Sequence, residues 1–145
     1  MINVGAIMTP RRDLVVMAPS DSLETARRAM TEQHIHHVPI LDDGGKLVGI
    51  VSHRDVLAAA APGRPGAPTE SSSMRLSDIM SSAPETIPAD CGVRQAALRL
   101  QALGIGCLPI VDEAGLAGIV TDTDFVAVAI NLLEQLEEVE PVSSN

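Results

Sequence analysis

Apolar and polar residues alternate in the same order in the two halves of the chain, with turn residues at matching places. Short apolar runs bounded by turn residues predict strands over residues 14–17, 38–41 and 47–51 of the first half. Residues 23–30 instead carry apolar side chains at helical spacing, and residues 93–103 repeat that pattern. We therefore expect each half to form a strand, a helix, two strands and a second helix.

Residues that favour helix ends stand where the periodic segments begin and stop. Ser20, Asp21 and Ser22 offer N-caps for the first helix, and Glu24 is placed to complete a capping box with Asp21. Gly104 supplies the stop of the corresponding helix in the second half. The last helix of the second half has no such stop, and we expect it to continue to about residue 138.

The two halves align as near-copies of one another. The corresponding segments are 6–9 with 78–81, 35–42 with 105–112, and 47–51 with 116–120. Differences in spacing are confined to predicted turns, which supports a structural repeat. Each copy alone is too small to bury its sheet well. We therefore predict an α/β (α+β) fold in which two β-α-β-β-α repeats pack sheet to sheet with pseudo-twofold symmetry.

The composition of the segments between these patterns suggests the domain boundaries. We expect a first repeat over residues 1–61 and a second over 75–133. Residues 62–74 are rich in proline, glycine and serine, which is typical of a flexible linker. Residues 134–145 are expected to form an acidic C-terminal tail.

One short motif occurs twice at a predicted strand-to-helix junction: Gly-Ile-Val, a hydroxyl residue and, three residues later, an aspartate. Ser52 and Thr121 stand at the helix N-caps, where unpaired backbone N–H groups favour an anion such as phosphate. Asp55 and Asp124 lie about one turn further on and could each accept two hydrogen bonds from a vicinal diol such as ribose. The motif thus indicates either nucleotide recognition or ordinary helix capping, and the spacing fits both.

Charge and composition exclude several partners. The formal charge of −9 at pH 7 argues against binding to a nucleic-acid backbone, although a small anionic ligand needs only a local positive field. We see no apolar run of about 18 residues and no export signal, so we expect no membrane span. The two cysteines, Cys91 and Cys107, are too few for a disulfide framework, and we expect reduced thiols in a cytoplasmic protein.

Other reactive side chains suggest no further chemistry. His34, His36 and His37 lie within four residues, but on a strand they would point to both faces, and no cysteine or carboxylate joins them at ligand spacing, so we expect no metal site. Cys107 opens an apolar strand and is expected to be a buried structural thiol. No phosphate-binding glycine loop with lysine, catalytic triad or carboxylate pair is recognisable, so we do not expect an enzyme.

Taken in order, the motifs resemble a tandem pair of CBS domains, which assemble as a Bateman module. The resemblance rests on the Ile-Met-Thr and Ile-Met-Ser openings, the two Pro-Ile strands that end in aspartate, and the two Gly-Ile-Val junctions, and it runs from about Val4 to about Leu133. It implies an adenosine-containing ligand, such as AMP, ADP, ATP or S-adenosylmethionine, with or without magnesium and with no covalent cofactor. The ligand would bind in clefts between the repeats.

The resemblance also implies which residues line each cleft. One cleft would combine Ser52, Asp55, Thr86, Ile105 and Gly106. The other would combine Thr121, Asp124, Pro10, Val15, Ile35 and His36. Because His53 and Arg54 lie beside the first carboxylate and Asp122 beside the second, we expect the first cleft to bind a charged nucleotide better.

These features suggest a regulatory sensor that changes conformation when a nucleotide binds and signals to a partner protein. The resemblance implies a homodimer paired through helices, and the apolar segment 125–130 offers a surface for it. The alternative is a ligand-free dimerisation or protein-interaction module in which the repeated motif only caps helices.

Overall fold

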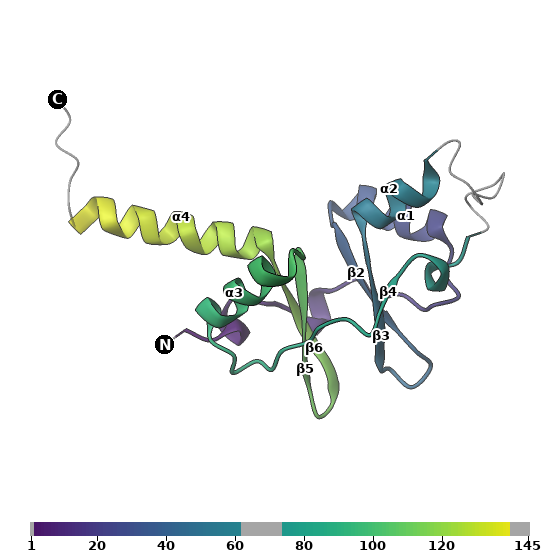
Figure 1. The fold of residues 1–145 in the computed structure, drawn as a ribbon, viewed down its shortest axis with the longest axis horizontal. Helices are drawn as coiled ribbons and strands as arrows, with labels where there is room; N and C mark the ends of the chain where they lie inside the picture. The colour runs from purple at the N-terminus through teal and green to yellow at the C-terminus, as the bar shows by residue number, and fades with distance from the viewer. Residues whose placement is uncertain (1, 62–73, 140–145) are drawn as a thin grey trace.

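The computed structural model describes residues 2–61 and 74–139, which form two three-stranded sheets with helices on their outer sides (Figure 1). The first half contains β1 (Thr9–Pro10), α1 (Leu23–Gln33), β2 (His37–Leu41), β3 (Leu47–Ser52) and α2 (His53–Ala60). The second half contains β4 (Ser81–Ser82), α3 (Val93–Leu103), β5 (Cys107–Asp112), β6 (Gly115–Thr121) and α4 (Asp122–Val139). Short 3-10 helices lie at Val4–Ala6, Arg11–Asp13 and Leu76–Asp78.

Each half lends its first strand to the sheet of the other half. The two antiparallel sheets have the strand orders β2-β3-β4 and β1-β6-β5. Strand β1 belongs to the first copy, yet Pro10 pairs with Gly118 of β6. Strand β4 belongs to the second copy, yet Ser82 pairs with Gly49 of β3. The sequence identified these openings as repeats of one another but did not indicate that they would be exchanged.

The exchange extends into the hydrophobic cores. Val4 is fully buried in the core of the second half, together with Ile87, Leu108 and Val120. Leu76 is buried in the core of the first half. A third cluster joins the two sheets through Ile50, Cys107 and Ile119. The predicted α/β fold of two repeats packed sheet to sheet is therefore confirmed.

Two glycines make room for the exchanged segments. A Cβ atom at Gly118 would collide with the carbonyl oxygen of Thr9 and lie 2.9 Å from the sulfur of Met8. A Cβ atom at Gly49 would lie 2.9 Å from Cγ of Met80. The glycine of the repeated junction motif therefore permits the close approach of another backbone, as a glycine within a strand often does.

The strand expected over residues 14–17 is wrong except at its last residue. Only Met17 joins the sheet, as an isolated parallel bridge to Ile40. The N–H of Met17 donates to the carbonyl of Pro39, and the carbonyl of Met17 accepts from the N–H of Leu41. Pro39 has no N–H to donate, so the ladder cannot be extended beside it.

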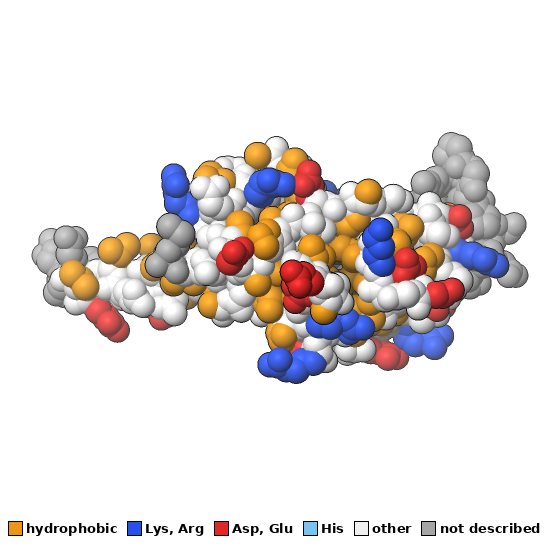
Figure 2. Space-filling view, turned by 90° about the horizontal axis from the view of Figure 1, so that it is seen from below, with side chains coloured by type: hydrophobic (Ala, Val, Ile, Leu, Met, Phe, Trp, Pro, Cys, Tyr) orange, Lys and Arg blue, Asp and Glu red, His pale blue; other side chains and the backbone are white. Residues whose placement is uncertain are grey.

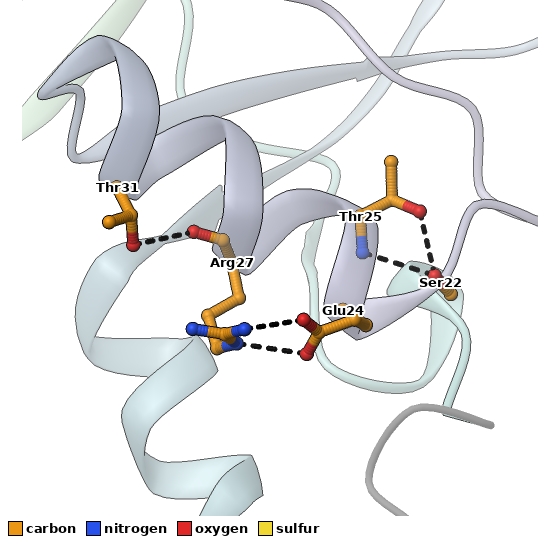
Figure 3. Close-up of polar contacts among 5 residues, drawn as sticks. All are labelled: Ser22, Glu24, Thr25, Arg27 and Thr31. Atoms are coloured by element: carbon orange, nitrogen blue, oxygen red, sulfur yellow. Dashed lines mark hydrogen bonds and ion pairs between the residues drawn. The ribbon is translucent and has the colours of Figure 1, made fainter.

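The start of α1 also differs from the expected capping box. Ser22 is the N-cap, and its hydroxyl accepts a hydrogen bond from the N–H of Thr25 at 3.1 Å (Figure 3). Glu24 pairs instead with Arg27, and Asp21 accepts from the N–H of Ala18. A capping box from Asp21 needs Glu24 at the third helical position. Because the helix begins one residue later, that position is held by Thr25, which cannot complete a capping box.

The remaining helix boundaries follow the expectations more closely. Gly104 ends α3 in the left-handed conformation with a φ of 64°, and α4 continues to Val139, one residue beyond the expected end. His34 ends α1 at a φ of 54°, and β2 begins only at His37. The expectation that His34 and His36 also lie on a strand was therefore wrong. The expected linker, apart from residue 74, and the last six residues lie outside the described residues.

Candidate functional site

A cleft of about 860 Å³ lies between the two halves, at the carboxyl ends of β3 and β6. The first half contributes His36, His37, Ile50, Ser52, His53, Arg54, Asp55 and Leu57 to its lining. The second half contributes Ser81, Pro84, Glu85, Leu103, Gly104, Ile105, Gly106, Cys107 and Asp122. Clefts at such junctions between similar units are a preferred place for a small ligand.

The hydroxyl and the carboxylate of the first junction are held in place by a capping box. The N–H of Ser52 donates to Oδ2 of Asp55 at 2.8 Å, and the N–H of Asp55 donates to Oγ of Ser52 at 3.1 Å. Capping chemistry is thus present, as one interpretation of the motif required. A carboxylate has a second oxygen and a hydroxyl can still donate its proton, so capping leaves both groups able to bind a ligand in the cleft.

The second junction uses more of its polar groups internally. The N–H of Thr121 donates to Oδ2 of Asp124 at 2.8 Å, and the Thr121 hydroxyl lies 3.3 Å from the same oxygen and 2.9 Å from the Thr123 hydroxyl. The N–H of Thr123 donates to the side chain of Asp122. The first turn of α4 is therefore satisfied by its own side chains, including a carboxylate at the position where the first junction has a histidine.

Two equivalent backbone hydrogen bonds, one in each half, join residues at the cleft. The N–H of His53 donates to the carbonyl of His36 at 2.8 Å, and the N–H of Asp122 donates to that of Gly106 at 3.1 Å. The rings of His36 and His53 lie with their centroids 5.5 Å apart. The repeat therefore places two imidazoles together in one half where the other half has a glycine and an aspartate.

A third histidine lies against the opposite half. A Cβ atom at Gly106 would lie 3.4 Å from both Nε2 of His37 and Oδ2 of Asp122, so these two side chains flank the same glycine. Burial lowers the pKa of His37 below its ordinary value, and the carboxylate of Asp122 opposes that shift only in part. The backbone at Gly106 therefore lies between side chains of the two halves.

The structure brings most of the residues expected in the first cleft to one place. Six of them line it: Ser52, His53, Arg54, Asp55, Ile105 and Gly106. Thr86 does not line the cleft, but its neighbours Pro84 and Glu85 do. His36, expected in the other cleft, lines this one.

The residues expected to form the second cleft are not brought to this one. They are Thr121, Asp124, Pro10, Val15 and Ile35, and none of them is part of its lining. Pro10 pairs with Gly118 on β6, the strand that ends at Thr121, so these two share one sheet as the repeat implies. A smaller depression of about 280 Å³ lies instead between α3 and α4, lined in part by Leu100, Asp122 and Phe125.

Several lining residues were not identified from the sequence. His37 and Cys107 are equivalent positions of the two copies, and both line the cleft. The repeat alignment could have indicated them, because His37 directly follows Ile35-His36 and Cys107 directly follows Ile105-Gly106. Leu57, Leu103 and Glu85 carry no sequence signal of this kind, since their place depends on how the halves pack.

Cys107 is a buried thiol, as expected. It is 7% exposed and belongs to the cluster between the sheets. Burial, with the nearby carboxylates of Asp124 and Asp122, raises the pKa of Cys107 to about 12. The thiol therefore stays protonated at neutral pH and is a poor nucleophile. Within residues 2–61 and 74–139, no three histidine, cysteine or acidic side chains are grouped so as to hold a metal ion.

Comparison with known proteins identifies the repeated unit. A family model described as the CBS domain matches residues 4–62 and again residues 76–131. A CBS domain-containing protein of Dictyostelium discoideum is 34% identical over 123 residues, covering 78% of this chain and 82% of that protein. An inosine-5'-monophosphate dehydrogenase of Korarchaeum cryptofilum is 38% identical over 114 residues, but these span only 22% of the dehydrogenase and 78% of this chain.

Solved structures share the whole fold. A proposed acetoin utilization protein (AcuB) of Vibrio cholerae is 38% identical, with a TM-score of 0.78 over 95% of this chain and 97% of that one. CBSX2 in complex with AMP is 30% identical, with a TM-score of 0.79 over 91% of this chain and 98% of that one. The CBS domain pair of protein MJ0100, in complex with 5'-methylthioadenosine and S-adenosyl-L-methionine, is 25% identical, with a TM-score of 0.78 over 90% and 98%. Among the described helices, none is long and apolar enough to cross a membrane.

Proposed function

Because the chain belongs to the CBS domain family, as a tandem pair of these domains, we propose that it is a regulatory module that binds an adenosine-containing ligand between its halves. The observation that carries the proposal is the cleft of about 860 Å³ in which Ser52 and Asp55 of one half face Ile105 and Gly106 of the other. Complexes of two similar structures with AMP and with S-adenosyl-L-methionine support this ligand class.

The proposed contacts follow from the chemistry of the lining. The oxygen of Asp55 that is not used in the capping box would accept hydrogen bonds from the ribose hydroxyls. Ile105 and Gly106 would lie against the adenine, and Ser52 and Arg54 would face the phosphate. We propose a binding role for the cleft, because similar CBS-pair structures hold AMP and S-adenosyl-L-methionine as bound ligands.

Binding would be converted into a signal through the relative placement of the halves. A ligand that contacts both halves favours the arrangement that it fits best, by an amount limited to its difference in affinity for the two arrangements. We propose that a partner protein, in the cytoplasm, responds to this change. Magnesium would enter only with the phosphates of a nucleotide.

Thermal unfolding with a panel of AMP, ADP, ATP, S-adenosylmethionine and adenosine tests the proposal. A ligand at about 100 times its dissociation constant should stabilise the folded chain by about 2.7 kcal/mol and raise the melting temperature measurably. Absence of a shift with every compound would favour an interaction module that needs no ligand.

Replacing Asp55 with alanine should weaken AMP binding at least about tenfold, since the diol would lose a charge-assisted hydrogen bond. Asp124→Ala is the matched control, because it removes the equivalent carboxylate from the other junction and disturbs helix capping in the same way. Calorimetric titration of each variant with AMP measures the affinity. A larger loss in Asp124→Ala would contradict the assignment of the stronger site to Ser52 and Asp55.

A second surface favours an interaction with another copy of the chain. Helix α4 projects away from the sheets (Figure 1), and Figure 2 shows hydrophobic side chains along this projecting end. Val126, Ile130 and Leu133 are each more than half exposed and, at spacings of four and three residues, lie along one helix face. We propose that this face pairs with the same face of a second copy, because an exposed apolar stripe along a helix can contact its own copy in a twofold dimer.

Ile130→Glu should convert this dimer into a monomer, because each protomer would bury an unpaired carboxylate in the interface. Asn131→Glu adds the same charge at the next position, where the helix is polar, and should leave the dimer intact. Sedimentation velocity at micromolar concentration distinguishes the two states. A wild-type chain that sediments as a monomer would refute the pairing, without bearing on the ligand site.

A further inference from the structure

The two imidazoles of His36 and His53 form a feature of the cleft that the second half does not repeat. Their ring centroids are 5.5 Å apart, and a main-chain hydrogen bond of 2.8 Å fixes one segment against the other. At the equivalent positions the second half has Gly106 and Asp122. Helix capping does not require an imidazole, so the capping function does not explain this pair.

The charged groups around the pair make its protonation important. Asp55 and Arg54 come from α2, Asp122 from α4 and Glu85 from the segment after β4, while His37 of β2 and Cys107 of β5 complete the titratable lining. With neutral imidazoles, one guanidinium therefore faces three carboxylates, a balance that disfavours an anion. With His36 and His53 charged, three cations face the same three carboxylates.

We infer that His36 and His53 form a proton-dependent subsite for the phosphate of the ligand, so that the cleft binds an anionic adenosine derivative together with protons. The inference rests on the proposed function and adds to it a dependence on pH. Histidine is the side chain whose ordinary charge change falls between about pH 5 and 8, which makes it suited to this linkage. His37 contributes less, because its burial favours the neutral ring.

The direction of the effect follows from which form the ligand favours. An anion attracts charged imidazoles more strongly than neutral ones, so protonation of the pair and binding of the anion favour each other. The added affinity is then present in full at low pH and is lost as the pH rises and the imidazoles become neutral. The size of the effect is the ratio between the affinities of the protonated cleft and the neutral cleft for the anion.

Adenosine 5'-sulfate and adenosine, titrated by calorimetry between pH 5.5 and 8.5, test the inference. The sulfate keeps one negative charge throughout this range, and adenosine stays neutral, so neither ligand adds its own titration. We expect the affinity for adenosine 5'-sulfate to fall about tenfold from pH 6 to pH 8, and that for adenosine to change less than about twofold. Net proton uptake, measured at pH 7 in two buffers of different ionisation enthalpy, should accompany binding of the sulfate only.

The variant H36Q/H53Q should bind the sulfate with a flat pH profile, at the affinity that the wild type shows near pH 8. His34→Gln is the matched control, because His34 ends α1 outside the cleft lining and should leave the slope unchanged. If both ligands bind the wild type with the same pH profile, or the slope survives in H36Q/H53Q, the subsite is refuted while the adenosine site stands. If neither ligand binds at any pH, the proposed function fails as well.

Discussion

Replacing Val4 with aspartate should severely destabilise the whole fold at neutral pH. Val4 lies near the N-terminus, at the start of the first repeat, but its side chain is fully buried among Ile87, Leu108 and Val120 of the second half. An unpaired carboxylate at that place would cost several kcal/mol, whether it stays charged or takes up a proton. Because a domain of this size is stable by only about 5–15 kcal/mol in total, this loss is severe.

Circular dichroism during thermal unfolding measures the effect, and Ile2→Asp provides the control. Ile2 is 60% exposed and lies two residues away, so the same charge there should change the melting temperature little. Equal melting temperatures for the two variants would mean that the N-terminal segment is not packed in the second half.

Replacing Gly118 with alanine should destabilise the chain by about 3 kcal/mol, at the upper end of the usual cost of overpacking. The added methyl group would collide with the carbonyl oxygen of Thr9 and press on the sulfur of Met8 at 2.9 Å. Thr9 is itself paired with Ile119, so its backbone cannot move away without breaking the β1–β6 pairing. In an open strand the same substitution would instead stabilise, by about 0.5–1 kcal/mol.

Two other glycines calibrate this result. At Gly49 the nearest atoms belong to the flexible side chain of Met80, and the nearest backbone atom, the carbonyl oxygen of Ser81, is 3.1 Å away, so we expect a smaller loss there. At Gly44 the nearest atom is a side-chain oxygen of Asp42 at 3.4 Å, and alanine should be nearly neutral. Urea unfolding of the three variants should give this order, and a Gly118→Ala protein as stable as Gly44→Ala would contradict it.

Local signals predicted those parts of the fold that depend on neighbouring residues. Gly104 ends α3 in the left-handed conformation, which glycine adopts without strain, and apolar spacing placed Ala26 and Met30 of α1 in the core. The strand over residues 14–17 failed because its pairing depends on Pro39, a residue that lies on another strand and offers no N–H. Ser22, one of the three expected N-caps, begins α1, but the capping box expected from Asp21 and Glu24 failed by one residue, within the usual uncertainty of a helix boundary.

The exchange of strands could not be predicted, because pattern and propensity are the same whichever sheet a strand joins. The opening segments of the two copies are alike, so both sheets offer each of them a similar glycine and a similar edge. Only the tertiary packing decides between the alternatives. For the same reason the sequence grouped His36 with residues of the other cleft, whereas in the structure it lines the same cleft as Ser52, Asp55, Ile105 and Gly106.

The exchange of edge strands between the halves also determines how the chain comes apart. Opening the first half would withdraw β1 and Val4 from the second, and opening the second would withdraw β4 and Leu76 from the first. A species with one intact half and one unravelled half therefore has no stable form, although the chain arose from two similar units. Proteolytic cleavage between the units should yield fragments that stay associated and that denature in a single cooperative transition.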